Sequence, residues 1–243
     1  MTKNITPYKN SKRGKKQQIT KMFDTIAEEY DSLNRVISFG IDIKWRNKVV
    51  DVIKEKKPNN ILDIATGTGD LAINLANSGA KEIVGLDISR GMLEIGKEKI
   101  RLKQLSDVIN MQIGDSENLN FSNDSFDAVT VAFGVRNFET LEKGLKEIFR
   151  VLKPGGIFIV LETSVPKQIP FRQGYFVYTK LLLPLIGILF SKDKKAYSYL
   201  SNSAAKFPCG EAFNNILRKV GFINVTDQPQ TFGVATIYKA SKK

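Results

Sequence analysis

The chain has 243 residues, of which 42% are hydrophobic, and its formal net charge is +12 at pH 7. This length and composition suit a globular protein with a sizeable core and exclude a chain that is disordered throughout. There is no histidine and a single cysteine, Cys209, which excludes an internal disulfide, a zinc site built from His and Cys, and an imidazole base. We therefore expect no metal.

Two features bear on where the protein works. The chain does not start with a basic segment followed by an apolar stretch, so we predict no signal peptide and a cytoplasmic protein. The most apolar run, Leu181–Phe190, is ten residues long and contains Pro184 and Gly187. A membrane-spanning helix needs about 20 apolar residues, so this run is too short to cross a bilayer.

Residues 1–21 carry seven lysine or arginine side chains and no acidic one. We predict a disordered tail here, because so polar a stretch buries too little apolar surface to fold. A basic arm is equally compatible with binding to RNA, binding to anionic lipid, or simply keeping the chain soluble. The charge therefore does not select a partner.

Residues 22–57 are predicted to form N-terminal helices. Apolar residues recur at helical spacing in Phe23–Asp31 and again in Ile41–Glu55. In the second stretch Trp45 and Val49 lie on the apolar face. These helices precede the first predicted strand.

Residues 58–164 alternate short β-rich runs with helical patterns and form the predicted Rossmann-like core. The expected strands are Ile61–Ala65, Ile83–Ile88, Asn110–Ile113, Phe126–Phe133 and Ile157–Leu161, with helices near 70–78, 90–104 and 139–152. Strands separated by helices favour right-handed crossovers and a mostly parallel sheet with both faces covered. We therefore predict a doubly wound α/β fold.

A long segment, residues 165–208, follows the core and precedes a closing region, residues 209–243. In the closing region Phe222–Thr226 and Val234–Ala240 are predicted to form an antiparallel strand pair at the edge of the sheet. The segment before them is too long for an ordinary connection, and such insertions are commonly lids or binding loops. We expect residues 22–243 to be a single domain with this insertion.

The stretch ILDIATGTGDLAINLA predicts a strand, a tight glycine loop and a helix. Gly67, Gly69 and Ala72 match the G-x-G-x-x-G/A pattern of dinucleotide-binding enzymes, which is a weak motif by itself. Asp70 lies where a pyrophosphate would meet the helix N-terminus, and its carboxylate would repel that anion. S-adenosylmethionine has no phosphate, and its ammonium and sulfonium groups are cationic. Asp63 and Asp70 therefore favour it as the cofactor.

Acidic residues follow two further strands. Asp87 comes 18 residues after Gly69, close to the spacing at which an acid reaches ribose hydroxyls, and Asp115 with Ser116 could receive an adenine. Each acid could equally cap the next helix or turn, but a set in register with a glycine loop favours a cofactor edge. The expected cofactor contacts are Asp63, Gly67, Thr68, Gly69, Asp87, Ile88, Asp115 and Ser116.

Longer motifs run through most of the chain. They are D-x-A-x-G-T-G-D (63–70), GLDIS (85–89), GDSENLNF (114–121), AFGVRN (132–137), RVLKPGG running to ETS (150–164) and YDSLNRVISFGIDIKW (30–45). Together they resemble the UbiE/COQ5 family, the C-methyltransferases of menaquinone and ubiquinone biosynthesis. The last motif is similar to the family's N-terminal signature. The likeness extends from residue 22 to the end.

The resemblance implies a class I S-adenosylmethionine-dependent methyltransferase fold, with a seven-stranded, mostly parallel sheet and an antiparallel closing pair. It also implies methyl transfer to a ring carbon of demethylmenaquinol, giving menaquinol. A ubiquinone-pathway acceptor, 2-methoxy-6-polyprenyl-1,4-benzoquinol, or a dual specificity is the alternative. Asp42 stands where the family commonly has histidine, so that histidine cannot be an indispensable proton acceptor here, and Leu33 replaces a common methionine.

Arg136, Asn137 and Tyr30 are the expected catalytic residues. Arg136 follows the strand 126–133, and its guanidinium could stabilise a developing phenolate while Asn137 orients the other oxygen. Tyr30 could contact the quinol hydroxyl. The structural alternatives are an ion pair between Arg136 and a helix acid such as Glu139, and a Tyr30 that only packs.

Three other functions are less consistent with the sequence. An RNA methyltransferase is disfavoured because the C5-type enzymes use a cysteine, and Cys209 lies far from the strand 126–133, so we expect no nucleic-acid partner. A dehydrogenase is disfavoured by Asp70 and by the lack of an acid/base such as histidine. A non-catalytic membrane or assembly protein remains open from sequence alone.

The resemblance gives the apolar run Leu181–Phe190 an expected role. A polyprenyl tail is hydrocarbon, so we expect this run to cradle it, with Lys192, Lys194 and Lys195 meeting anionic head groups at the inner face of the cell membrane. A helix packed over the sheet is an equal alternative. The sequence does not determine the oligomeric state, and a homo-oligomer is one of the alternatives.

Overall fold

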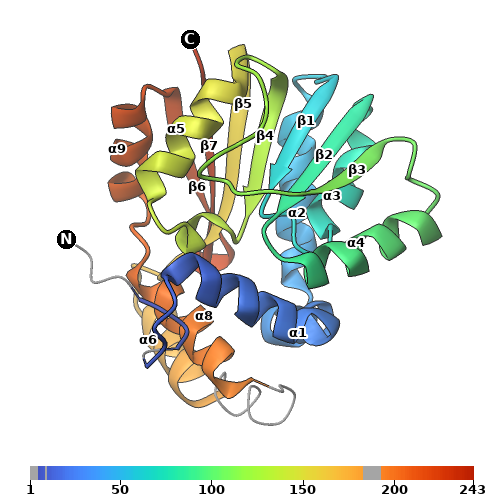
Figure 1. Cartoon of the computed structure of the whole chain (residues 1–243). Coiled ribbons are helices and arrows are strands. Elements are labelled where there is room, and N and C mark those ends of the chain that lie inside the picture. The colour runs from blue at the N-terminus through green and yellow to red at the C-terminus, as the bar shows by residue number, and fades with distance from the viewer. Residues whose placement is uncertain (1–4, 9, 183–192) are drawn as a thin grey trace.

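The computed structural model describes residues 5–8, 10–182 and 193–243, and Figure 1 shows how they are arranged. Within these residues one sheet holds the strands β1 (Asn60–Ile64), β2 (Glu82–Asp87), β3 (Ile109–Ile113), β4 (Phe126–Ala132), β5 (Leu152–Thr163), β6 (Ile223–Gln230) and β7 (Ala235–Ser241). The helices are α1 (Lys15–Ser38), α2 (Ile41–Lys54), α3 (Asp70–Leu75), α4 (Arg90–Leu102), α5 (Leu141–Val151), α6 (Phe171–Val177), α8 (Lys194–Lys206) and α9 (Glu211–Val220). Short helical turns are η1 (Ala76–Ser78), η2 (Val135–Asn137), η3 (Tyr178–Leu182) and η4 (Thr231–Gly233).

The strand order is β3-β2-β1-β4-β5-β7-β6. The strands β1 to β5 pair in parallel, and β7 is antiparallel to both β5 and β6. The predicted doubly wound class is therefore confirmed, including the closing antiparallel pair. Because the order reverses between β1 and β4, the loops that follow these strands diverge and leave space at the carboxyl edge of the sheet.

Helices cover both faces of the sheet, as strands with two apolar faces require. In β5, Phe158 and Val160 pack on the face covered by α5 and α9, whereas Ile159 and Leu161 pack on the face covered by α2, α3 and α4. This alternation follows from the two-residue period of a strand. The sheet is thereby held rigidly, and its carboxyl edge is presented to the remaining helices (Figure 1).

Helix α1 begins at Lys15 and lies across the carboxyl edge of the sheet (Figure 1). The prediction that residues 1–21 are a disordered tail is therefore wrong for residues 15–21, which belong to this helix. The predicted helix over Phe23–Asp31 is also too short at both ends. The prediction relied on the many charges of residues 1–21. Most helices in proteins are instead stabilised by the tertiary packing of one apolar face, which a charge count does not reveal.

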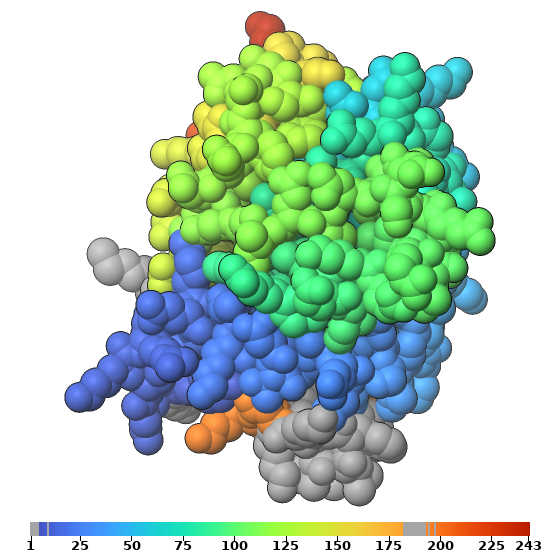
Figure 2. Space-filling view, turned by 45° about the vertical axis from the view of Figure 1, so that its right-hand side comes forward, coloured from blue at the N-terminus to red at the C-terminus, as the bar shows by residue number. Residues whose placement is uncertain are grey.

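That packing is visible in an apolar cluster under α1. Ile19, Met22 and Ile26 are buried there together with Met92 of α4 and Tyr199 of α8. In Figure 2 the blue atoms of α1 form a band directly against the green atoms of the core, with orange atoms of α8 below. The N-terminal helix is thus an integral cover of the sheet edge.

The segment 165–208 supplies α6, η3 and α8 at the same end of the molecule. The Tyr178 hydroxyl donates a hydrogen bond to the carbonyl of Ile37, at 2.6 Å, which ties this segment to α1. Residues 183–192 lie outside the described residues, and with them most of the predicted tail cradle, Lys192 and, for its side chain, Lys194. Among the helices that the structure describes, none combines the length and apolarity needed to span a bilayer.

Strand β5 starts earlier than the predicted Ile157. Leu152 already pairs with Phe126, and a register shift follows before the regular pairing of Ile157 with Ala128. The segment Lys153–Gly156 therefore lies within an irregular strand start.

Candidate active site

Two cavities lie at the carboxyl edge of the sheet and share two wall residues, Tyr30 and Phe133. We call the first the loop cleft, because it is lined by the loops after β1, β2 and β3 and is covered by α1. We call the second the helical cavity, because α1, α2, α6, α8, η2 and η4 supply most of its walls. The loop cleft is lined by Lys16, Ile19, Phe23, Tyr30, Ala65, Gly67, Leu86, Asp87, Ile88, Met92, Gly114, Asp115, Ser116, Glu117, Ala132, Phe133, Gly134, Asn137, Phe138 and Glu139.

The glycine loop after β1 reaches the loop cleft through Gly67. This residue has a φ of 58°, in the left-handed region that favours glycine. A Cβ placed on it would meet no other atom within 4 Å, so the backbone here opens into free space. Its amide N–H donates a hydrogen bond of 2.8 Å to Oδ2 of Asp87. A ligand can therefore approach the loop backbone closely.

Asp87, at the end of β2, is fixed by backbone donors. Its Oδ2 accepts from Gly67 and its Oδ1 accepts from the N–H of Ser89 at 2.9 Å. Burial of the carboxyl group raises its pKa, while the hydrogen bonds that it accepts act in the opposite direction. Each carboxylate oxygen has more than one acceptor position, so Asp87 can still accept from a ligand hydroxyl. Ile88 lines the cleft beside it.

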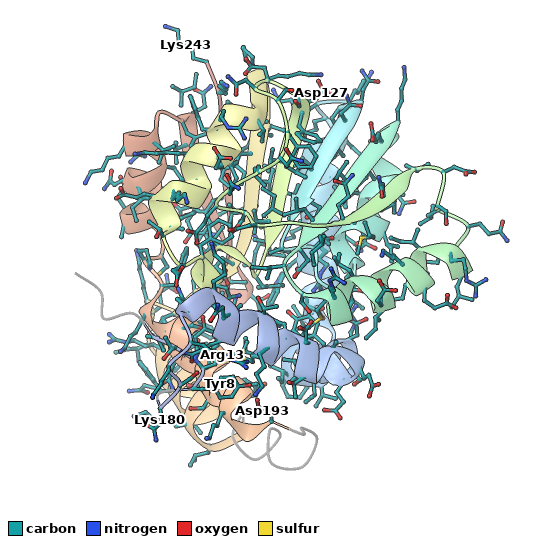
Figure 3. The ribbon with its side chains drawn as sticks, viewed as in Figure 1. Tyr8, Arg13, Asp127, Lys180, Asp193 and Lys243 are labelled. Atoms are coloured by element: carbon teal, nitrogen blue, oxygen red, sulfur yellow. The ribbon has the colours of Figure 1, made fainter. Side chains whose placement is uncertain are left out.

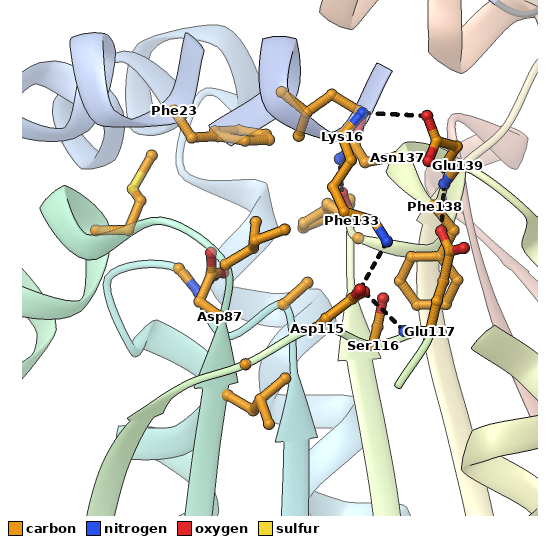
Figure 4. Close-up of a pocket in the computed structure, with 18 of the residues that line it drawn as sticks. Lys16, Phe23, Asp87, Asp115, Ser116, Glu117, Phe133, Asn137, Phe138 and Glu139 are labelled. Carbon is orange, nitrogen blue, oxygen red and sulfur yellow. Dashed lines mark hydrogen bonds and ion pairs between the residues drawn. The ribbon is translucent and has the colours of Figure 1, made fainter. Parts of the chain in front are cut away.

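Asp115 lies across the loop cleft from Asp87, with Ser116 beside it (Figure 4). Its Oδ1 accepts from the N–H of Glu117 at 2.9 Å, and its Oδ2 accepts from Nζ of Lys16 at 2.6 Å. Lys16 comes from α1, where the sequence predicted a tail, so its contact with the cleft could not be foreseen. The one signal was its position in an amphipathic helix that begins eight residues before the predicted one.

Three of the predicted cofactor contacts are absent from the lining of the loop cleft, within the described chain. Asp63 is buried behind the loop, where it accepts hydrogen bonds of 2.6 Å from the hydroxyls of Thr66 and Thr130. Burial raises its pKa to about 6. Thr68 is also buried, and its hydroxyl donates to Asp31 of α1 at 2.6 Å. Gly69 has a φ of 80° and completes the turn into α3. These residues shape the loop.

Asp70 has different neighbours from those expected. Its carboxylate forms ion pairs of 2.6 Å with Lys99 of α4 and with Arg35 of α1. Burial alone would raise the pKa of Asp70, but the charges of Lys99, Arg46 and Arg35 lower it below the ordinary value. The carboxylate is thus neutralised by the protein and ties the loop to α1.

Arg136 lies on η2, shortly after β4, and lines the helical cavity. Its Nη1 donates to the carbonyl of Phe133 at 2.8 Å and forms an ion pair with Glu162 of β5. The alternative partner considered from the sequence, Glu139, is not used. Burial works to lower the pKa of Arg136, yet the Glu162 carboxylate raises it overall, together with Tyr30 and Tyr199.

The Glu162 side chain of this ion pair is fully buried, and one polar atom on each partner makes no hydrogen bond among the described residues. Within the described part of the chain, Nε of Arg136 and Oε2 of Glu162 have no hydrogen-bond partner. Buried polar atoms are normally paired, and exceptions often mark functional sites. Glu162 was missed as a site residue, although it is the first residue of the ETS motif that contributed to the family resemblance.

Tyr30 and Asn137 flank this pair. Tyr30 borders both cavities, and burial raises the pKa of its hydroxyl, although the charges of Arg136 and Arg46 lower it. Asn137 lines the loop cleft, and its Oδ1 accepts from the hydroxyl of Tyr199 at 3.1 Å. The structure thus brings together the three residues predicted to be catalytic, with Arg136 on one cavity, Asn137 on the other and Tyr30 on both.

The helical cavity is mainly aromatic and apolar. It is lined by Tyr30, Asn34, Ile37, Ser38, Phe39, Ile41, Asp42, Trp45, Arg46, Phe133, Arg136, Thr163, Tyr175, Tyr178, Thr179, Leu200, Ser201, Ala204, Thr231 and Val234. Its charged lining residues include Asp42, which forms ion pairs with Arg35 and Arg46. Asp42, the position of the family's common histidine, therefore lies between two guanidinium groups.

The chain is similar to known proteins over almost its whole length. The family model described as the ubiE/COQ5 methyltransferase family matches residues 11–242. A protein of Bacteroides fragilis named demethylmenaquinone methyltransferase is 44% identical over 98% of this chain and 97% of its own length. A protein of Geotalea daltonii named ubiquinone/menaquinone biosynthesis C-methyltransferase UbiE is 45% identical over 97% of this chain and 100% of its own. Among solved structures, a SAM-dependent methyltransferase from Thermotoga maritima aligns with a TM-score of 0.63 at 21% identity, over 93% of this chain and 100% of that chain, and so shows the same fold.

Proposed function

Since the chain belongs to the ubiE/COQ5 methyltransferase family, we propose that it methylates a ring carbon of demethylmenaquinol and so produces menaquinol. Membership makes it a methyltransferase that uses S-adenosylmethionine as the methyl donor. One observation supports the finer proposal above all others. A cleft at the glycine loop and an aromatic cavity large enough for a ring share Tyr30 and Phe133, and Arg136 on the cavity wall donates to the carbonyl of Phe133.

The loop cleft fits S-adenosylmethionine. Gly67 offers open backbone, and Asp87 keeps free acceptor positions for ribose hydroxyls. Asp115 and Ser116 lie where an adenine amino group and ring nitrogen would be received, once Lys16 gives up its ion pair with Asp115. When bound, the cofactor supplies an electrophilic methyl group.

The aromatic cavity suits a quinol ring, and the acceptor must be reduced. A hydroquinol hydroxyl pushes electron density onto the neighbouring ring carbon, and its phenolate does so more strongly. A free phenol ionises near pH 10, as tyrosine does, so the protein has to favour the anion. The guanidinium of Arg136, in a site that excludes most water, stabilises a developing phenolate.

Tyr30 and Glu162 complete this arrangement. The raised pKa of Tyr30 keeps its hydroxyl protonated at neutral pH, so that it can donate to the acceptor oxygen. Glu162 holds the Arg136 side chain through Nη1, and the buried Nε keeps a donor that no group in the described chain uses. Asn137 orients the second oxygen from the side of the loop cleft.

The choice of a naphthoquinol ring rests on the relatives. The Bacteroides fragilis protein carries a menaquinone-pathway name, whereas the Geotalea daltonii protein, at a similar identity, is named for both quinone pathways. A dual specificity that includes 2-methoxy-6-polyprenyl-1,4-benzoquinol is therefore the second candidate. The quinol acceptor and the exposed apolar side chains support a cytoplasmic protein that works at the inner face of the cell membrane.

An assay with purified protein, labelled S-adenosylmethionine and both reduced acceptors distinguishes the candidates. We expect kcat/KM for demethylmenaquinol to exceed that for the benzoquinol by at least about tenfold, because one ring in a hydrophobic pocket changes transition-state binding by about 1–3 kcal/mol. Equal values would establish dual specificity. Transfer to neither acceptor would refute the proposal.

A further inference from the structure

Large hydrophobic side chains are exposed mainly at one end of the molecule. Of the twelve that the described residues expose, nine lie in residues 36–43, in residues 169–181 and at Phe232. Phe39 is 76% exposed and Phe232 is 68% exposed, although both rings would be more stable out of water. We define the apolar rim as Phe39, Phe171, Phe176, Val177, Leu181 and Phe232.

The segments that carry the apolar rim are neighbours in space. The ring of Phe171 stacks on that of Phe232 at a centroid distance of 3.9 Å. The ring of Phe39 lies 6.2 Å from that of Tyr178, whose hydroxyl binds the carbonyl of Ile37. Three stretches that are far apart in the sequence therefore form one surface.

The rim borders the helical cavity. Phe39 belongs both to the rim and to the cavity wall, and Tyr178 and Thr231, which also line the cavity, are each next in the chain to a rim residue. Because Phe39 is largely exposed, the cavity opens to the outside at this point. An occupant of the rim would therefore have direct access to the cavity that we assign to the acceptor.

Cationic side chains accompany the exposed rings. The guanidinium of Arg172 lies 5.8 Å from the centroid of the Phe176 ring, and Nζ of Lys180 lies 5.9 Å from it. In Figure 3 Lys180 lies at the α6 end of the molecule, whereas Asp127 and Lys243 lie at the opposite end. Aromatic residues next to basic ones are typical of proteins that bind the interface of an anionic bilayer.

We propose that the apolar rim docks the protein on an anionic lipid bilayer, with the mouth of the helical cavity turned toward the membrane. Only the identity of the molecule that then enters, a quinol with a hydrocarbon tail, rests on the proposed function. A second copy of the chain fits this surface less well, because a symmetric contact would place Arg172 and Lys180 close to their counterparts and would close the cavity.

Vesicle flotation tests the docking surface directly. The purified wild-type chain should float with vesicles of phosphatidylglycerol and only weakly with vesicles of phosphatidylcholine. The double variant Phe176→Ser/Phe232→Ser should reduce partitioning to anionic vesicles by at least about tenfold, since each ring loses its apolar burial. Arg172→Glu/Lys180→Glu should reduce it by about fivefold for each charge removed. Leu102→Ser/Ile223→Ser, which replaces exposed apolar residues elsewhere, is the matched control and should bind as the wild type does.

A second measurement serves if the serine variant does not fold. Phe232→Trp keeps an aromatic ring, and its added fluorescence should be quenched by brominated lipids, whereas that of Leu102→Trp should not. Equal flotation of the rim variant and the wild type, or no quenching at position 232, would overturn the proposal. So would a wild-type dimer in sedimentation equilibrium that the rim variant abolishes. These outcomes do not depend on methyl transfer, so a failure of the proposed function is seen separately.

Discussion

The loop cleft and the helical cavity differ in how the chain builds them. Most polar contacts of the loop cleft come from short motifs at the ends of β1, β2 and β3, and the backbone amides of Gly67 and Ser89 hold Asp87 in place. The helical cavity is assembled from α1, α2, η2, α6, α8 and η4, which are spread from residue 15 to residue 233. If the loop cleft binds the cofactor and the helical cavity binds the acceptor, as we propose, cofactor binding is a local property of the sheet edge, whereas acceptor binding depends on the packing of distant helices.

If this division is correct, substitutions on the two sides have separable effects. Changes at the Arg136–Glu162 pair should alter turnover and leave cofactor affinity intact, and changes at Asp87 should do the opposite. Each prediction below tests one side of this division.

The largest effect is expected from Glu162→Ala. Removing the carboxylate leaves the Arg136 charge buried without a counter-ion, so the free energy of unfolding should fall by about 3 kcal/mol. Urea unfolding measures the change, with Glu82→Ala, an exposed acid at the start of β2, as the control. The double variant Arg136→Met/Glu162→Met should recover most of the stability without activity. If Glu162→Ala unfolds at the wild-type urea concentration, the pair does not hold the site together.

Next in size is Arg136→Ala. It should lower kcat by about 100-fold, because the developing phenolate loses its main electrostatic partner. The dissociation constant for S-adenosylmethionine, measured by calorimetry, should stay within about twofold of the wild-type value. Arg101→Ala removes an exposed arginine of α4 and serves as the control. A large loss of cofactor affinity in Arg136→Ala would show that the two regions are not separable.

Asp87→Ala should change the affinity for the cofactor and leave the acceptor site unaffected. Loss of its hydrogen bonds to the ribose is expected to cost about 2 kcal/mol, which weakens cofactor binding by about thirtyfold. The ranking of different acceptors should not change. Calorimetry on Asp87→Ala and on the exposed control Asp107→Ala tests this. Unchanged affinity would remove Asp87 from the ribose site.

The effect of Asp63, behind the glycine loop, is the smallest when it is taken per pH unit. Burial raises its pKa from 3.8 to about 6. Between these values the folded chain holds a proton that the unfolded chain has released, so stability falls as the pH rises through this window, by at most about 1.4 kcal/mol per pH unit. Asp63→Asn cannot ionise and should lose this part of the slope in urea unfolding at pH 4, 5 and 6. Identical slopes would show that Asp63 does not titrate there.

The sequence predicts the sheet and the loop cleft well for a physical reason. Strand and helix periods and the glycine loop are local patterns, and parallel strands present their carboxyl ends at one edge. Asp87, Asp115 and Ser116 could therefore be placed from spacing. The neighbours of Asp63 and Asp70 could not be predicted, because they come from distant parts of the chain, such as Thr130 and Lys99.

The same limit applies more strongly to the helical cavity. Residues 15–21 looked like a solvated tail, because the burial of Ile19 depends on α4 and α8. Glu162 looked like one residue of a strand, and its pairing with Arg136 depends on the register of β4 and β5. Arg136 and Asn137 were predicted from their place after the strand 126–133, and Tyr30 from the family's N-terminal signature, and their catalytic role stays a prediction.

The oxidation state of the acceptor offers the most direct test of the proposed chemistry. Purified protein with S-adenosylmethionine should methylate demethylmenaquinol under reducing, oxygen-free conditions, and product should be detected by mass spectrometry. The oxidised quinone should give no product, because its ring carbon is electron-poor and it has no hydroxyl for Arg136 to stabilise as a phenolate. Equal methylation of the quinone, or none of the quinol, would contradict a site in which Arg136 activates a bound quinol.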